Sequence, residues 1–448
     1  MANVPVRFTF GKSRYHADIW DDPSHPTPSN PLDPDVVTLD PARGRLGYTF
    51  LRGEVVGERE GGRPARWTVG LEVTEQFSQQ SGAILPPHAV GEARRVLEGH
   101  QLQYGVLFAD YRLEPRPDLT IQAGVRWETG SQVANVGQDR VAPRLSLRFR
   151  MNPRLSVSAA YGRSYQYAQP IGGAGKPFGP QFHYAQTWLL AGTQSPVLRS
   201  DVGTLGVERW LGGTWLASAT GYVRHATGVA MEDPRPGSVF PVGWPGVEPR
   251  SAWVDGTNTA FGLEMGVRRL AGRVTGSAAY SLGVSNFKMG QLDFASPADR
   301  RHVLDATLMA RARDNLLFGA AFTAASGAPF TRTFNDYCHD WPDAEGNCPA
   351  PATGPITFRG PPNAERGPTY ASLDLLLDWT SRRSGWSWGA YLQVRNVLGR
   401  DNMGVFVETT CGADSYVGGG CSSPELLTDS FEGGLSFPLP LFGFRLTF

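Results

Sequence analysis

The 448-residue sequence contains no apolar run long enough for a membrane-spanning helix and no excess of charge of either sign. A helical span needs about 20 consecutive apolar residues, and here 42 basic residues balance 42 acidic ones. The balance leaves no basic field to hold nucleic acid and no acidic block typical of a disordered tail. A membrane is not thereby excluded, because a transmembrane β-strand needs only about 10 residues with alternating faces.

The N-terminal segment MANVPVRFTFGKSRYHADIW also lacks the basic stretch, apolar core and small-residue cleavage site of a signal peptide. An exported protein would need its signal elsewhere. Gly (54) and Pro (35) are abundant, and aromatic residues make up 11% of the chain. This composition suits many short strands joined by turns and loops.

Cysteine is scarce, and the four cysteines form two pairs of equal spacing, Cys338 with Cys348 and Cys411 with Cys421. We predict a disulfide within each pair, which implies an oxidising compartment. Free thiols in a cytosolic protein are the alternative. A metal site in the segment CHDWPDAEGNC is a weaker one, because its spacing matches no standard set of zinc ligands.

Catalytic motifs are missing as well. The eight histidines are scattered, neither G-x-S-x-G nor H-E-x-x-H occurs, and GGAGKPFG at 172–179 lacks the spacing and the hydroxyl residue of a phosphate-binding loop. We therefore expect no enzymatic activity, no catalytic residue, no metal and no cofactor.

What the sequence does contain is a period of two, the signature of β-strands. In the segment HVLDATLMARAR, Leu304, Leu308 and neighbouring alanines alternate with Asp305 and Arg311. After a break at 313–315, a second alternating run follows, so the two runs predict a hairpin. We expect Leu304, Leu308, Phe318 and Phe322 to face lipid and Asp305, Arg311 and Thr323 to face a wet interior.

The same alternation recurs in LTIQAGVRWE (119–128), RLSLRFR (144–150), ASLDLLLDW (371–379), WSWGAYLQVRN (386–396) and FGFRLTF (442–448). Charged side chains on the polar faces are candidates for a lumen, where they would form paired ladders or a substrate path, or only solvate and brace the interior. These candidates are Arg126, Arg144, Arg148, Asp305, Arg311, Asp374, Asp378, Arg395 and Arg445. Trp379, Trp386 and Trp388 lie near a short turn and are expected in an aromatic girdle at the membrane interface.

Connections between the predicted strands alternate in length. Short turns such as 151–154, 211–213 and 270–272 alternate with long segments at about 80–102, 165–202, 227–257, 326–369 and 397–436, well beyond the usual roughly 2 to 6 residues. Outer-membrane barrels have tight periplasmic turns and long external loops. The pattern predicts one antiparallel transmembrane β-barrel domain over 1–448 with about 16 strands, and counting back from Phe448 places both cysteine pairs in external loops.

Four segments, RPDLTIQAGVRWE, DRRHVLDATLMARARDNLLFGAAFTAASGAPFT, ERGPTYASLDLLLDW and LQVRNVLGRDN, follow one another along the chain and precede the terminal aromatic Phe448. None of them is specific alone, but in their order and spacing across 100–448 the sequence resembles the C-terminal β-barrel of TonB-dependent receptors. Asn396, Val397 and Leu398 match the family's Asn-Leu-Phe-like element only in part. Family barrels have about 22 strands and follow a signal peptide and a plug. The chain is therefore expected to be a fragment that is incomplete at its N-terminus, with a shortened relative that works without energised gating as the alternative.

The resemblance implies uptake of a scarce nutrient of the siderophore, vitamin, oligosaccharide or peptide class across the outer membrane of Gram-negative bacteria. It implies as partners outer-membrane lipid, the nutrient ligand, the barrel-assembly machinery, which recognises the terminal Phe448, and TonB only where a plug is supplied. The alternatives are a porin-like passive channel, a surface-binding barrel without transport, and a soluble β-propeller or sandwich protein.

Overall fold

The computed structural model describes residues 6–18, 43–59, 63–84, 94–129, 139–171, 187–191, 196–232, 253–336, 356–383, 385–402, 405–411, 416–417, 420–421, 427–432 and 436–447. Every regular element in these ranges is a β-strand. No helix in this part of the chain is long and apolar enough to span a membrane.

One antiparallel sheet of 17 strands makes up most of the structure. One of its members, β14 (Leu292–Ala295), only extends the end of β13, and the others pair one after another in chain order. These others are β1 (Val6–Asp18), β2 (Arg43–Arg59), β3 (Ala65–Ile84), β4 (Arg94–Arg116), β5 (Leu119–Thr129), β6 (Arg140–Asn152), β7 (Leu155–Gln166), β10 (Leu198–Trp210), β11 (Trp215–Glu232), β12 (Trp253–Arg269), β13 (Val274–Met289), β15 (His302–Arg313), β16 (Leu316–Ala325), β21 (Tyr370–Arg383), β22 (Trp386–Arg395) and β27 (Leu439–Thr447).

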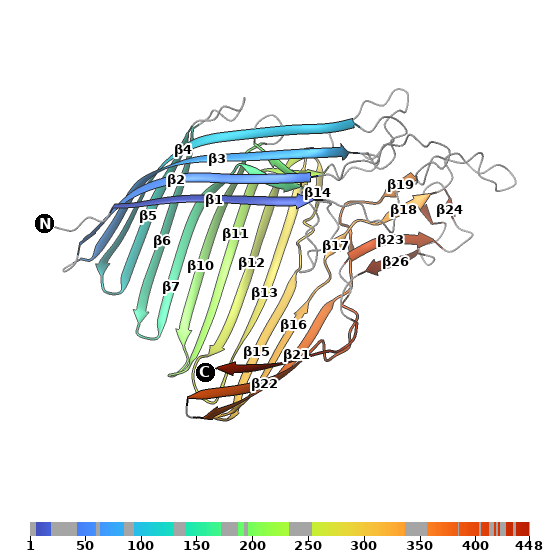
Figure 1. The fold of residues 1–448 in the computed structure, drawn as a ribbon. Helices are drawn as coiled ribbons and strands as arrows, with labels where there is room; N and C mark the ends of the chain where they lie inside the picture. The colour runs from blue at the N-terminus through green and yellow to red at the C-terminus, as the bar shows by residue number, and fades with distance from the viewer. Residues whose placement is uncertain are drawn as a thin grey trace.

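The sheet is strongly curved, so that β1 to β4 run across the direction of β6 to β16 (Figure 1). Tight turns join β4 to β5, β6 to β7, β10 to β11, β12 to β13 and β15 to β16, and they lie along one rim. The opposite ends of these strands, from which the longer connections leave, lie at the other rim (Figure 1). The all-β fold, the strand number and the alternation of connections confirm the predicted antiparallel barrel of outer-membrane type.

Glycine and asparagine shape the tight turns. Gly212 between β10 and β11 has φ 80° and Gly272 between β12 and β13 has φ 110°, a left-handed conformation that costs glycine little. At the β6–β7 turn the side chain of Asn152 accepts a hydrogen bond of 2.9 Å from the backbone N–H of Arg154. The turn chemistry of the sequence thus fixes where each strand reverses.

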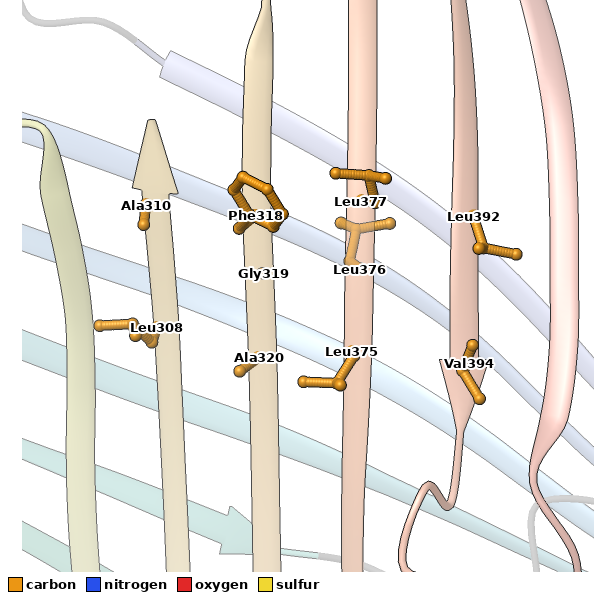
Figure 2. A pocket seen from close by; sticks show the side chains of 10 residues that line it. All are labelled: Leu308, Ala310, Phe318, Gly319, Ala320, Leu375, Leu376, Leu377, Leu392 and Val394. Carbon is orange, nitrogen blue, oxygen red and sulfur yellow. The ribbon is translucent and has the colours of Figure 1, made fainter. Parts of the chain in front are cut away.

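The convex face of the sheet is apolar. Leu308 on β15 pairs with Ala320 on β16, which pairs with Leu375 on β21. Figure 2 shows these side chains lining a shallow hollow on one face of the sheet, with the N-terminal strands passing behind the other face. Leu205 on β10 is 69% exposed and Phe444 on β27 is 78% exposed. An apolar surface of this extent is unfavourable in water and suits the hydrocarbon of a bilayer.

On β10, a charged side chain lies at each end of the apolar stretch of this face. Asp201, towards the long connections, accepts hydrogen bonds from Arg163 Nε at 2.7 Å and from the Tyr161 hydroxyl at 2.6 Å. Leu205 and Val207 follow on the same face, and Arg209 ends the series near the tight turn. An apolar band with a polar edge on each side is the pattern expected at the two surfaces of a membrane.

The long connections contain secondary structure of their own, which the sequence did not predict. Five short hairpin pairs form there: β8 (Ala168–Ile171) with β9 (Thr187–Leu190), β17 (Pro329–Phe330) with β20 (Glu365–Arg366), β18 (Thr333–Asp336) with β19 (Ile356–Arg359), β23 (Val405–Cys411) with β26 (Leu427–Glu432), and β24 (Tyr416–Val417) with β25 (Gly420–Cys421). The connection expected at 80–102 is shorter, because β3 and β4 extend to 20 and 23 residues.

Candidate functional site

The face opposite the apolar one is lined by charged side chains that pair across strands. On β5, Arg126 alternates with the exposed Val125, and on β6, Arg144 and Arg148 alternate with Leu145 and Leu147. Since neighbouring side chains of a strand point to opposite faces, these arginines lie on the concave side.

The densest charged group comprises Arg52, Glu54, Glu72, Arg126 and Glu128 and is called the Arg126 cluster. Arg126 donates to Glu128 through Nε at 2.8 Å and to Glu72 through Nη2 at 3.0 Å. Arg52 lies 2.9 Å from Glu54 and 3.5 Å from Glu72. Two guanidinium groups from β2 and β5 thus connect three carboxylates, so that each charge has a partner of opposite sign.

Burial and neutral neighbours hold the Arg126 cluster in place. Glu72 and Glu128 are each only 5% exposed, and Thr74 donates a hydrogen bond of 3.2 Å to Glu72. The guanidinium of Arg52 lies 4.0 Å from the ring centre of Phe108, a cation–π contact. Because every arginine is paired, the cluster offers no free positive charge for an anion.

Other ion pairs on this face reach over an intervening strand. Arg144 on β6 donates to Asp110 on β4 through Nε at 2.7 Å. Its side chain passes over Gly124 of the intervening strand β5, which pairs with Asp110 on one side and with Arg144 on the other. A Cβ at Gly124 would lie 2.2 Å from Asp110 Oδ1 and 2.6 Å from Arg144 Nε. The absent side chain of this glycine is therefore what lets the pair form.

The same arrangement recurs near the C-terminal strands. Arg445 on β27 donates to Asp378 on β21 at 2.7 Å and to Thr380 at 2.9 Å. It crosses β22 at Gly389, whose added Cβ would lie 3.1 Å from Arg445 Nε. A small residue on the middle strand again leaves room for a charged pair between its neighbours.

The remaining predicted charged residues are more exposed or more locally bound. Arg148 contacts Glu208 at 2.6 Å, and Arg395 lies 4.0 Å from Asp374. Asp305 accepts a hydrogen bond of 2.7 Å from Thr323. Arg311 is exposed on the face that it shares with Asp305. The predicted residues do not converge on one centre but form separate pairs along the wall.

The motif LQVRNVLGRDN contains the end of β22 and the turn that follows it from Asn396. Asn396 is 2% exposed and has φ 50°, a left-handed conformation that asparagine tolerates better than most residues. Its N–H donates to Asp374 at 2.9 Å, and its side chain donates to the carbonyl of Arg400 at 3.0 Å. Asn402 accepts from the N–H of Ala371 at 2.9 Å, which joins the turn to β21.

Sequence reasoning missed the acidic partners Glu54, Glu72, Asp110 and Glu208. A period-two signal exists for Glu72, because the segment LEVTEQ alternates Leu71 and Val73 with Glu72 and Thr74. The pairing itself has no sequence signal, because partners such as Arg126 and Glu72 are separated by 54 positions.

Two long connections are joined by a side-chain contact that we call the Arg332 clasp. Arg332 donates to Asp429 through Nε at 3.0 Å and Nη2 at 2.8 Å, and to Glu365 through Nη1 at 3.1 Å. Beside it, the rings of Phe330 and Phe431 meet edge to face at 5.3 Å. The hydrogen bond to Asp429 raises the pKa of Arg332, so the charged form that holds the clasp persists at any physiological pH.

The other predicted residues are placed as follows. The ring centres of Trp379 and Trp388 lie 4.5 Å apart in an edge-to-face contact beside the β21–β22 turn, and Trp386 is the first residue of β22. Cys411 and Cys421 end β23 and β25, but their side chains, like Cys338, Cys348 and Phe448, lie outside the described residues. The two disulfides and the terminal assembly signal stay predictions.

Comparison with protein families gives a match over residues 5–397 to the model described as TonB dependent receptor-like, beta-barrel. The chain belongs to this family. Comparison with curated proteins gave no match to this sequence.

Solved structures of TonB-dependent receptors share the fold. A mutant of the ferric enterobactin receptor PfeA of Pseudomonas aeruginosa matches with TM-score 0.54 and 18% identity over 98% of this chain and 58% of that chain. The siderophore receptor PirA of Acinetobacter baumannii (TM-score 0.54, 12% identity) covers 89% of this chain and 57% of its own. The ferric-catecholate import receptor Fiu of E. coli matches with TM-score 0.54 and 13% identity over 90% of this chain and 58% of that chain. The chain thus spans less than two thirds of each.

Proposed function

We propose that this chain is the barrel of an outer-membrane receptor that takes up a scarce nutrient, with a siderophore as the first candidate ligand. The family match over residues 5–397 carries the proposal. The structural neighbours support the ligand class, since they include a PfeA mutant in complex with enterobactin and the siderophore receptor PirA.

The two faces of the sheet support the location and the path. The apolar convex face is suited to lipid, with Trp379, Trp386 and Trp388 at one interface, and the ion-paired concave face is suited to a wet lumen. In this arrangement Arg126, Arg144, Arg148, Arg395 and Arg445 line the path as paired charges. Such pairs attract water and polar solutes without binding an anion tightly.

The external side is the natural place for ligand capture, because the long connections meet there through the Arg332 clasp. A clasp between two loops holds them in one arrangement, which lowers the entropic cost of binding between them. The two predicted disulfides, Cys338–Cys348 and Cys411–Cys421, belong to the same two connections of the sequence and would add rigidity if formed. Alkylation of intact protein followed by mass spectrometry tests them: all four thiols reacting without reduction would reject both.

Ligand binding and passive permeation separate this proposal from its main alternative. The protein, purified from outer membranes in detergent, is titrated with ferric enterobactin and with a ferric hydroxamate while tryptophan fluorescence is recorded. Saturable quenching by one of them at micromolar concentration or below is the expected result. A protein that quenches with neither and gives steady conductance in a planar bilayer would instead be a porin-like channel.

A further inference from the structure

The β8–β9 hairpin lies against the concave face of the sheet rather than extending away from its rim. It contacts β2, β3 and β4 on one side and β11 on the other. Between β4 and β11 the sheet contains β5, β6, β7 and β10. The hairpin, green in Figure 1, lies behind β2 and β3 in that view. It therefore reaches across the interior from one part of the wall to another.

Apolar packing holds one side of the hairpin. Leu190 and Ala191 are 2% and 1% exposed and pack in a cluster with Leu102 and Tyr104 of β4. Leu107, on the opposite face of the same strand, is 50% exposed. The hairpin is thus seated on the concave face and leaves the apolar convex face free.

Polar contacts of Gln169 hold the other side. Its amide nitrogen donates to the carbonyls of Pro196 at 3.0 Å and Gly228 at 2.9 Å, and its amide oxygen accepts from the N–H of Ala230 at 2.9 Å. Gly228 and Ala230 belong to β11 and lie at or beside a bulge between Thr227 and Val229, where the register shifts, whereas Pro196 precedes β10. Gln169 is 4% exposed, so one buried side chain fixes β8 to β11.

A third contact joins the hairpin to the Arg126 cluster. The Tyr167 hydroxyl, just before β8, donates to Glu128 at 2.6 Å, and its ring lies 4.5 Å from that of Tyr104. Burial, and to a lesser extent the hydrogen bond to Glu128, raises the pKa of Tyr167. The hydroxyl therefore keeps its proton, and the contact persists over the physiological pH range.

From these three attachments we infer that the β8–β9 hairpin, here called the strap, is a built-in constriction that sets the largest solute able to enter the interior from the loop side. The inference rests on the proposed function in taking the concave face as the transport path. Its covalent link to β7, its apolar seat on β4 and its buried glutamine on β11 make it a fixed part of the wall. Solutes larger than the remaining opening are excluded until these contacts break.

The test compares solute entry into liposomes that contain the full chain. The variant Gln169→Ala combined with Tyr167→Phe removes the polar attachments of the strap, and Gln122→Ala, an exposed residue on the concave side of β5, is the matched control. Swelling is followed with neutral saccharides of increasing size. We expect the double variant to admit the largest saccharides at least about twofold faster than wild type, and the control to equal wild type.

Equal rates for wild type and double variant with every saccharide, including no entry by either, would overturn the inference. Heat-modifiable migration on gels verifies that each barrel has folded. If the double variant does not fold, Tyr167→Phe alone, which removes a single oxygen atom, is judged by the same criterion. Failure of the proposed function is seen separately, as absent siderophore binding by the wild-type protein.

Discussion

Replacing Arg126 with leucine should destabilise the barrel more than replacing any exposed arginine of the concave face. The substitution leaves Glu72 and Glu128, whose side chains are each 6% exposed, without the cation that bridges them. Breaking a buried pair by removing one partner costs about 3 to 5 kcal/mol. Because Arg126 itself is 31% exposed, we expect the lower end, about 3 kcal/mol, or roughly a 100-fold change in the unfolding equilibrium.

The control for this prediction is Arg148→Leu. Arg148 and Glu208 are 61% and 46% exposed, and exposed pairs contribute only about 0 to 1 kcal/mol. Urea unfolding of protein in lipid vesicles, followed by tryptophan fluorescence and heat-modifiable migration, measures both variants. Adding Glu72→Gln and Glu128→Gln to Arg126→Leu should recover part of the loss, since the buried charges are then gone. Equal midpoints for Arg126→Leu and Arg148→Leu would refute the reasoning.

Three further outcomes follow from the same structure. Leu205→Arg on the convex face should cost about 2 to 4 kcal/mol in lipid, whereas Thr204→Arg on the concave face should be tolerated; equal losses in vesicle unfolding would mean that the faces are misassigned. Asn396→Ala should lower the folded fraction, because it removes the side-chain hydrogen bonds and forces alanine into a backbone conformation that costs about 1 to 3 kcal/mol. Asn396→Gly removes the same hydrogen bonds without this strain, so a larger fraction of it should fold, as measured by heat-modifiable migration. Arg332→Lys keeps the charge but loses the two-pronged contact with Asp429, so limited proteolysis of the external loops should accelerate severalfold, and an unchanged cleavage rate would show that the clasp does not restrain them.

The wall of the barrel could be predicted from the sequence because each strand carries its own signal. On β15 and β16 the alternation of Leu304, Leu308 and Phe318 with Asp305 and Thr323 sets which residues share a face, and the observed register pairs Asp305 with Thr323. Burial on one side and charge on the other determine such a pattern locally. The tight turns are equally local, since a left-handed glycine or an asparagine suffices.

The pairing of charges and the folding of the long connections could not be predicted in this way. Glu72 and Arg126 come together because β3, β4 and β5 align in a particular register, which no single segment specifies. The strap is a stronger example, since Gln169 finds its partners at a bulge 59 positions away, at Gly228. These contacts depend on the assembled wall, and the period-two signal ends where the strands end.

The apolar band of β10 also determines how this protein fits a bilayer. Asp201 and Arg209 on the convex face are about 26 Å apart at roughly 3.3 Å per residue, and a strand tilt of about 40° reduces this to a height of roughly 20 Å. The usual apolar band of outer-membrane barrels is about 25 Å tall. The lipid beside β10 must therefore thin by a few ångströms, or Arg209 must extend its side chain to the headgroups. Hydrophobic mismatch at this strand would favour a thin membrane, and the bacterial outer membrane is thinner than average.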